Sequence, residues 1–253
     1  DADAARWSSE EEKNAVVGEA KFLRAFAYRF LANMWGTAPL ILEETTEPRF
    51  DYTNSTQEGL YKQCKEDLEF AIQWMPDIDD QKGGRASKVA AQHLLSEILI
   101  GLKDYDGAIK QASAVIDNPA MHLMTGRFGK LKDFTFEGYD YQGEKEPWGD
   151  VWWDLFREGN FNRTEGNAEC IWNVQFDVDI EGGGNIGQWG GNFVMERWFS
   201  PTWWNRKDLD GNANWMKATL SGRPSAAAFV SDYMGKQIWE YKDDWDRDMR
   251  NSQ

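Results

Sequence analysis

Apolar residues in the first half of the chain recur at intervals of three and four residues, the spacing of one face of an α-helix. The first such run predicts a helix with an apolar seam made of Val16, Ala20, Leu23, Ala27, Phe30 and Met34. Gly36 and Pro39 end this helix, because glycine accepts a left-handed exit and the residue before proline avoids helical dihedral angles. An extended apolar segment is expected after it.

Three more helices are predicted before residue 119. The pattern Ser55-Thr-Gln-Glu58 is a capping box that announces the second helix, and Pro76 closes it. The third helix runs from about Ser87 to Leu102, and the fourth follows the short turn Lys103-Asp-Tyr-Asp106. The inward residues of the second helix are predicted to be Leu60, Cys64, Leu68, Ala71 or Ile72, and Met75. Those of the third and fourth are Ala91, Leu94, Leu95, Ile98, Leu102, Ala108, Ile109, Ala112, Val115 and Ile116.

The third and fourth helices together resemble a tetratricopeptide hairpin. Small residues such as Ser96 and Ala112 let two antiparallel helices pack closely in that repeat, and the turn Asp104-Tyr-Asp106 joins them. The signature tryptophan of the repeat is absent. Because one repeat cannot bury its own face, the first two helices are expected to form the neighbouring pair.

The composition of the sequence changes after Pro119. Residues 120–253 hold most of the glycines and tryptophans and few long amphipathic runs. Alternation over residues 168–179 predicts a strand whose buried face carries Trp172, Val174, Phe176 and Val178. A glycine-rich loop at residues 181–191 and a last helix from about Ser225 to Lys242 follow. The predicted fold is therefore mainly α with a few short strands: a helical scaffold over residues 1–119, and a loop-rich, tryptophan-rich ligand-binding part over residues 120–253, intertwined as one domain.

The charge balance narrows the classes of partner. The 253 residues include 43 Asp and Glu against 28 Lys and Arg, a formal charge of −15. A nucleic-acid or anionic-membrane surface needs basic patches, so neither partner is expected. No run is apolar enough to span a bilayer, and the polar N-terminus does not have the pattern of a signal peptide. The two cysteines show neither metal spacing nor a disulfide framework, and Cys64 is expected in the core.

Tryptophan is the most unusual feature of the composition, with 14 in the chain. Several lie among Gly, Asn, Asp and Arg, which are neighbours typical of loops. An indole face matches the apolar C–H face of a pyranose, and the polar neighbours can bond its hydroxyl groups, so a neutral glycan suits this composition; core packing is the alternative for each ring. If two adjacent tryptophans lie on a strand, at most one of them can stack on a given sugar. The candidate contacts are Trp152, Trp153, Trp189, Trp198, Trp203 and Trp204.

Catalytic and metal motifs are weak by comparison. Asp150 and Asp154 lie among aromatic residues and are a conceivable acid–base pair of a glycoside hydrolase. No nucleophile motif surrounds His93 or His122. The glycines 182, 184 and 187 match a dinucleotide fingerprint without a following helix start, and the acidic residues 177–181 begin a calcium loop that lacks its twelfth-position glutamate. We expect no catalytic residue, no metal and no cofactor.

Several segments together resemble the SusD/RagB family, the surface glycan-binding lipoproteins of starch-utilisation-type systems in Bacteroidota. The most specific segment is Gly18-Glu-Ala-Lys-Phe-Leu-Arg-Ala with its exit Trp35-Gly-Thr-Ala-Pro39. The hairpin ending in residues 104–109, the segment 169–176 and the segment 246–252 add to it. Family members are considerably longer, so the chain is expected to be an internal fragment. The lipid-accepting N-terminal cysteine of the family is not present in it.

The resemblance implies a tetratricopeptide-like scaffold with a glycan site on irregular loops. It also implies a non-catalytic protein, lipid-anchored in its full-length form at the outer membrane surface, that delivers glycan to a SusC-like TonB-dependent transporter. Binding residues vary within the family, so none of the tryptophans is assigned by it. A protein-binding tetratricopeptide scaffold and, less favoured, a glycoside hydrolase are the alternatives.

Overall fold

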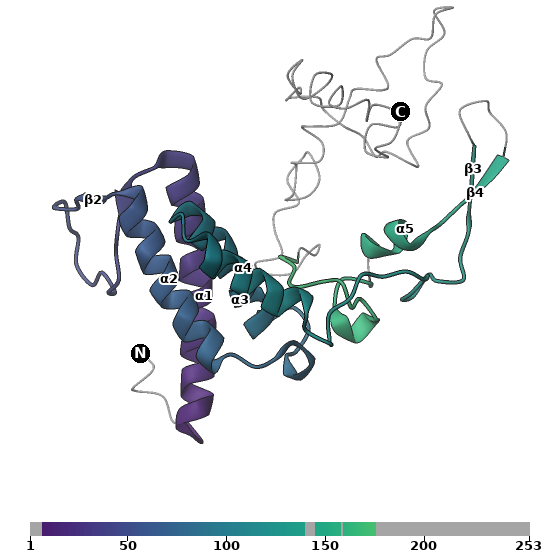
Figure 1. Ribbon diagram of the computed structural model, residues 1–253, viewed down its shortest axis with the longest axis horizontal. Helices are drawn as coiled ribbons and strands as arrows, with labels where there is room; N and C mark the ends of the chain where they lie inside the picture. The colour runs from purple at the N-terminus through teal and green to yellow at the C-terminus, as the bar shows by residue number, and fades with distance from the viewer. Residues whose placement is uncertain (1–6, 140–144, 158, 176–253) are drawn as a thin grey trace, which may run out of the picture. The chain divides into compact units, whose positions relative to one another are not determined.

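The computed structural model describes residues 7–139, 145–157 and 159–175. The chain divides into two compact units, Asp1–Val174 and Gln175–Gln253, and all the described helices and strands belong to the first. This unit is mainly helical, which confirms the predicted fold class (Figure 1). The functional division at residue 119 stays a prediction. The glycine-rich loop at 181–191 and the helix expected from Ser225 lie outside the described residues.

The first helix, α1 (Glu10–Trp35), begins and ends as its sequence predicts. The side chain of Ser9 caps it by accepting a hydrogen bond from the Glu12 amide at 3.1 Å, and three glutamates in the first turn complement the helix dipole. At the other end Gly36 has φ = 74°, and its N–H bonds the carbonyl of Ala32 at 3.1 Å. The left-handed exit explains why glycine stands there.

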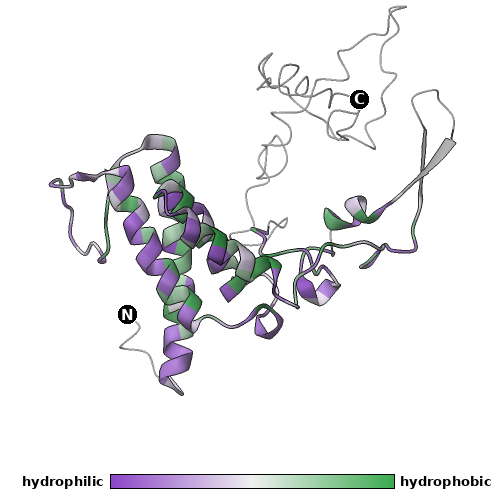
Figure 2. Ribbon diagram, viewed as in Figure 1, coloured by the Kyte–Doolittle hydropathy of each residue, from purple (hydrophilic) through white to green (hydrophobic). Residues whose placement is uncertain are grey.

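The buried face of α1 is not the predicted one. All six residues of the apolar seam (Val16, Ala20, Leu23, Ala27, Phe30 and Met34) are exposed. The buried residues lie on the opposite side of the helix: Gly18, Phe22, Ala25, Tyr28 and Ala32. Small residues on that side allow a close approach, since a Cβ at Gly18 would lie 3.4 Å from the Ala71 Cα of the neighbouring helix. The prediction was wrong because it weighed hydropathy and overlooked the small residues. Figure 2 shows a hydrophilic start of α1 and apolar residues further along it.

The second helix, α2 (Gln57–Trp74), packs against α1 with the predicted residues. Leu60, Cys64, Leu68, Ala71 and Met75 are all buried in the main hydrophobic cluster. The cap is Thr56, one residue later than the predicted capping box, and it accepts from the Gly59 amide at 3.1 Å. Between the two helices, β1 (Ala38–Pro39) pairs antiparallel with β2 (Asn54–Ser55) and closes a loop.

The third and fourth helices, α3 (Lys88–Gly101) and α4 (Tyr105–Ile116), form the predicted hairpin. Asp104 caps α4 by accepting from the Gly107 amide at 3.0 Å, and Lys103 has φ = 63° in the turn. Consecutive helices pack on one another, α1 on α2, α2 on α3 and α3 on α4 (Figure 1). The predicted inward residues of α3 are buried or half-buried. On α4 two of the predictions were wrong, since Ile109 and Ile116 are exposed.

A buried ion-pair cluster joins α1 to α2. The carboxylate of Asp67 is fully buried and accepts two hydrogen bonds from Arg24, at 2.7 and 2.6 Å, and one from Lys21 at 3.1 Å. The hydrogen bonds with Asp67 raise the pKa of Arg24. The basic residues of the motif Lys21-Phe-Leu-Arg24 therefore fix how the two helices dock.

Beyond α1 to α4, the described residues of the first unit contain further short elements tied back to the helices. They are η1 (Ile78–Asp80), β3 (Phe136–Tyr139) paired antiparallel with β4 (Lys145–Trp148), α5 (Val151–Leu155) and η2 (Arg163–Glu165). Asn162 accepts from the Gly84 amide at 2.9 Å, and Arg163 pairs with Asp79 at 2.5 Å. No helix within the described part of the chain has the length and apolar character needed to cross a membrane.

The strand predicted at 168–179 is wrong over its described part, residues 168–175, which form no strand. Trp172 is half-buried there, and Val174 is exposed. Trp172 packs edge-on against Phe22 and Phe26, with ring centroids 5.2 and 5.3 Å apart, and its Nε1 donates to the Gly84 carbonyl at 3.2 Å. This segment is therefore held by aromatic contacts with α1 and not by pairing in a sheet.

Candidate functional site

Two aromatic side chains are presented by the short helix α5 and the residue that ends it: Trp152 lies on the helix, and Phe156 is its C-cap. Trp152 and Phe156 are 62% and 63% exposed, and their rings meet edge to face with centroids 5.0 Å apart. Residues four apart lie on the same side of a helix, so the two rings form one surface. We call Trp152 and Phe156 the aromatic platform. Phe156 was missed by the sequence analysis, although its spacing from Trp152 was a usable signal.

Trp153, the neighbouring candidate, has a different environment. It is half-buried, and two guanidinium groups lie over its ring, Arg157 at 4.1 Å and Arg127 at 5.5 Å from the centroid. These cation–π contacts cover part of the Trp153 ring. Because the pair lies on a helix and not on a strand, the two indoles point about 100° apart. Trp152 is the more exposed of the two.

A buried polar network holds α5 in place. Asp154 has no exposed surface and pairs with Arg127, whose Nε donates to it at 2.5 Å and whose second terminal nitrogen donates at 3.1 Å. The amide of Phe128 donates to the same carboxylate at 3.1 Å. The side-chain hydrogen bonds with Asp154 raise the pKa of Arg127. Asp150 caps the helix through the Trp153 amide at 2.7 Å.

Arg127 also reaches beyond α5. It donates to the carbonyl oxygens of Gly149 at 2.7 Å, Leu131 at 2.8 Å and Phe134 at 3.0 Å. Phe134 and Gly149 lie just outside the two ends of the β3–β4 hairpin, so one guanidinium ties together the hairpin base, the preceding loop and α5. Neither Arg127 nor its role was apparent in the sequence, because the partners are far apart along the chain.

The same geometry bears on catalysis. The carboxylates of Asp150 and Asp154 are the pair that the sequence analysis considered as acid and base of a hydrolase. Asp150 caps the helix and remains exposed, whereas Asp154 is fully buried against Arg127, so only one of the two carboxylates is open to solvent. Within the described residues, no group of three His, Cys, Asp or Glu side chains could hold a metal ion.

A groove of about 500 Å³ runs between α1, α3 and the segment 155–173. Its apolar wall includes Phe26 and Trp172, and Phe156 of the aromatic platform also lines it. On its polar side Arg29 pairs with Glu97 at 2.6 Å. The groove and the platform are therefore continuous through Phe156, with a size and lining typical of small-molecule sites.

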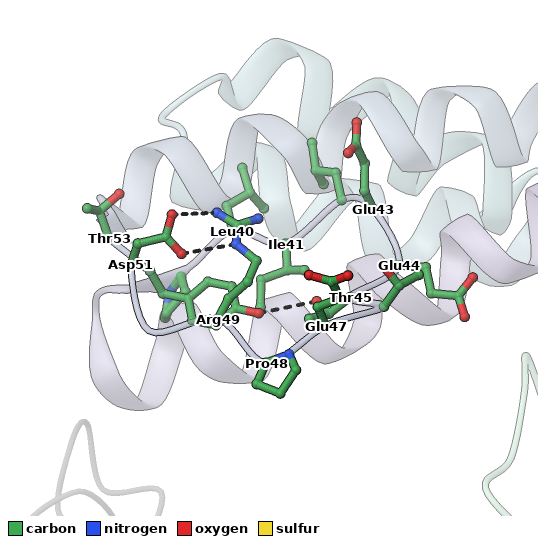
Figure 3. A pocket seen from close by; sticks show the side chains of 14 residues that line it. Leu40, Ile41, Glu43, Glu44, Thr45, Glu47, Pro48, Arg49, Asp51 and Thr53 are labelled. Atoms are coloured by element: carbon green, nitrogen blue, oxygen red, sulfur yellow. Dashed lines mark hydrogen bonds and ion pairs between the residues drawn. The ribbon is translucent and has the colours of Figure 1, made fainter.

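A second pocket of about 550 Å³ is enclosed by the single loop Pro39–Thr53 (Figure 3). Arg49 and Asp51 form a two-point ion pair at 3.0 Å across it, and the hydroxyl groups of Thr45 and Tyr52 lie 3.2 Å apart. Its lining is mostly polar, without an aromatic face comparable to the platform. Of the six tryptophans proposed as contacts, four lie outside the described residues: Trp189, Trp198, Trp203 and Trp204.

Comparisons with known proteins identify the relatives of the chain. Residues 4–100 match the family model of SusD-like proteins described as "Starch-binding associating with outer membrane". SusD-like protein P25 of Formosa agariphila is 24% identical over 217 residues, covering 85% of this chain and 34% of the relative. SusD-like protein P2 of the same organism is 31% identical over 140 residues, covering 54% of this chain and 27% of the relative. The chain thus spans about a third of the length of these relatives.

Solved structures agree on the fold. A SusD-like protein from Bacteroides fragilis superposes with a TM-score of 0.51 at 24% identity, over 68% of this chain and 29% of that one. Surface glycan-binding protein A from Bacteroides uniformis superposes with a TM-score of 0.55 at 18% identity, over 82% of this chain and 37% of that one. At these identities the likeness concerns the fold alone, and it confirms the helical architecture.

Proposed function

Since the chain is related to the SusD-like proteins, as its sequence motifs predicted, we propose that it binds a glycan without transforming it and that the aromatic platform of α5 contacts the sugar. The observation that supports this most is the exposed edge-to-face pair of Trp152 and Phe156. Exposed rings of this size are costly to leave in water, and an indole face complements the C–H face of a pyranose.

The surroundings of the platform support binding by a preformed surface. The Arg127–Asp154 pair and the Asp150 cap fix α5, so little ordering accompanies ligand contact. The groove beyond Phe156 offers a continuation for further sugar units. Trp189, Trp198, Trp203 and Trp204 remain further candidate contacts, and Trp153 is a supporting residue.

In its cellular setting, the proposed role is that of a surface glycan-binding subunit at the outer membrane of a bacterium. The full-length protein would carry a lipid anchor and would pass a neutral oligosaccharide to a SusC-like TonB-dependent transporter. The location, the lipid anchor and the transporter partner are proposed from the relationship to the family. The local geometry adds one supporting point, since Asp154 is fully buried and paired with Arg127, which does not suit it to act with Asp150 as an acid–base pair.

A titration of the intrinsic tryptophan fluorescence of the chain against soluble polysaccharides tests the proposal. Soluble starch is the first probe, followed by β-glucan, xylan and mannan. A saturable response to one of them, without release of reducing sugar, is the expected result. Release of reducing sugar that is lost on carboxylate substitution would identify a hydrolase instead. No response to any of them, from this chain or from a full-length protein containing it, would favour a protein-binding tetratricopeptide scaffold.

A further inference from the structure

The part of the chain that follows α5 forms one wall of the groove with little regular secondary structure. Among its described residues, the only regular element is the single turn η2. Two asparagine side chains in it are nevertheless buried, Asn160 with no exposed surface and Asn167 with 3% exposed. Because a buried carboxamide is costly unless its polar atoms are hydrogen-bonded, the partners of these two side chains show what they hold together.

Asn160 joins this part of the chain to α5. Its Oδ1 accepts a hydrogen bond from the Lys130 amide at 3.0 Å. Its Nδ2 donates to the carbonyl oxygens of Asp154 at 2.9 Å and Phe128 at 3.4 Å. Asp154 belongs to α5 and stands two residues before Phe156 of the aromatic platform. Asn160 therefore anchors the end of the helix that carries the platform.

Asn167 extends the same connection to the groove wall. Its Nδ2 donates to the backbone carbonyl of Asn160 at 2.9 Å, and its Oδ1 accepts from the amides of Glu169 at 3.2 Å and Cys170 at 3.0 Å. These two residues lead to Trp172, which lines the groove and packs against α1. We call Asn160 and Asn167 the asparagine pair. Its hydrogen bonds run without a break from α5 to the residues beside Trp172.

The partners of the asparagine pair fix the chemistry that both positions need. Each side chain meets at least one backbone N–H, which can only donate, and at least one backbone carbonyl, which can only accept. A carboxamide supplies a donor and an acceptor without carrying a charge. An ionised aspartate has the same shape but only accepts, and leucine does neither. The two positions are therefore specified by contacts between segments and not by the local conformation of the chain.

Given the proposed glycan-binding function, on which this inference rests, we propose that Asn160 and Asn167 are positioning residues of the glycan site. They hold Phe156 of the platform and Trp172 of the groove wall in one fixed arrangement, and they act on the sugar through these two rings. An oligosaccharide long enough to reach from the platform into the groove then meets two surfaces that are already ordered. A short oligosaccharide contacts the platform alone.

Calorimetric titration with a short and a long oligosaccharide tests the proposal. The probes are maltotriose and maltoheptaose, or the trimer and heptamer of whichever polysaccharide gives the fluorescence response. The parent should bind the longer probe more tightly, and Asn167→Asp should lower the ratio of the two association constants by about two- to tenfold. This substitution keeps the acceptor for Glu169 and Cys170 and removes the donor to Asn160. Asn54→Asp, the same change at an exposed position of β2, should leave both affinities unchanged.

The pH dependence of Asn167→Asp separates positioning from a general loss of stability. Burial raises the pKa of a carboxyl group, so on acidification the new side chain takes up a proton and can again donate to the Asn160 carbonyl. Between about pH 7 and about pH 5 the ratio of association constants should therefore return towards that of the parent at the same pH. The parent is the reference because the titratable residues of the groove, His93, Glu97 and Glu169, are common to both chains.

A folded Asn167→Asp with the ratio of the parent at both pH values would overturn the proposal, as would a parent that binds the two probes equally. A parent that binds neither oligosaccharide would contradict the proposed function itself. Hydrogen exchange of the free parent needs no variant, and it decides the case in which Asn167→Asp does not fold. The amides of Lys130, Glu169 and Cys170 should be protected before sugar is added, and exchange at the rate of an unstructured peptide would overturn the proposal.

Discussion

Replacing Asp67 with asparagine should weaken the docking of α1 on α2 more than any change to a surface ion pair. The carboxylate is fully buried and accepts from Arg24 at 2.7 and 2.6 Å and from Lys21 at 3.1 Å. Asparagine keeps the shape but removes the negative charge. It also turns one acceptor into a donor that faces these cations.

The magnitude follows from the burial of the partners. Removing one member of a fully buried ion pair costs about 3–5 kcal/mol. Here the side chains of Arg24 and Lys21 keep 28% and 30% of their surface exposed, so both cations retain part of their hydration. The expected loss in the free energy of unfolding is therefore about 2–3 kcal/mol, below the full range because of this remaining solvation.

Urea unfolding followed by far-UV circular dichroism measures this loss, since the signal comes mainly from the helices. Glu19→Gln is the matched control, because it neutralises the carboxylate that pairs with Arg85 at the surface, where about 1 kcal/mol or less is expected. If Asp67→Asn destabilises the chain no more than Glu19→Gln does, the argument for a buried ionic contact between α1 and α2 is refuted.

Three further predictions concern the core, a turn and a thiol. Leu95→Ala, at a buried position of α3, should lower the unfolding free energy by about 2–5 kcal/mol in the same urea assay, and a loss under about 1 kcal/mol would contradict the packing. Gly129→Ala should speed hydrogen exchange over residues 149–157 without changing the helical circular dichroism signal. The reason is that Gly129 has φ = 73° and a Cβ there would collide with the Asn160 carboxamide. Unchanged exchange would contradict this prediction. Burial raises the pKa of Cys64 to about 12, so iodoacetamide near pH 9 should modify it only in urea. Because the thiol ionises more easily in the unfolded chain, its contribution to stability should be present below about pH 8.5 and fall as the pH rises towards 12.

Helices with one apolar stripe were predictable from sequence. For α2 and α3 the stripe and the buried face coincide, and Gly36 and Pro76 mark helix ends where chain geometry requires them. For α1 the same reasoning selected the wrong side, because a helix with two apolar faces has no single stripe to find. Gly18, Ala25 and Ala32 contribute little hydropathy, yet they permit the close contact with α2 that decides the packing.

The candidate site was predictable only in part. Trp152 could be selected because of its residue type and neighbours. The different surroundings of Trp152 and Trp153 could not be predicted, because they depend on Arg127 and Arg157 lying over the Trp153 ring. Arg127 donates hydrogen bonds to residues as far apart in the sequence as Leu131 and Asp154, and no local sequence pattern predicts such contacts. The segment around Trp172 alternates like a strand, but its aromatic contacts with Phe22 and Phe26 outweigh that local preference.

Calorimetric titration of Trp152→Ala and Trp35→Ala with the polysaccharide that gives the fluorescence response tests the central claim most directly. The two indoles are matched in exposure, 62% and 66%, but only Trp152 belongs to the aromatic platform. Loss of a stacking tryptophan is expected to cost about 1.4–3 kcal/mol, a weakening of about tenfold or more, while Trp35→Ala should bind like the parent. Equal affinities for the two variants would show that the platform on α5 is not the glycan site.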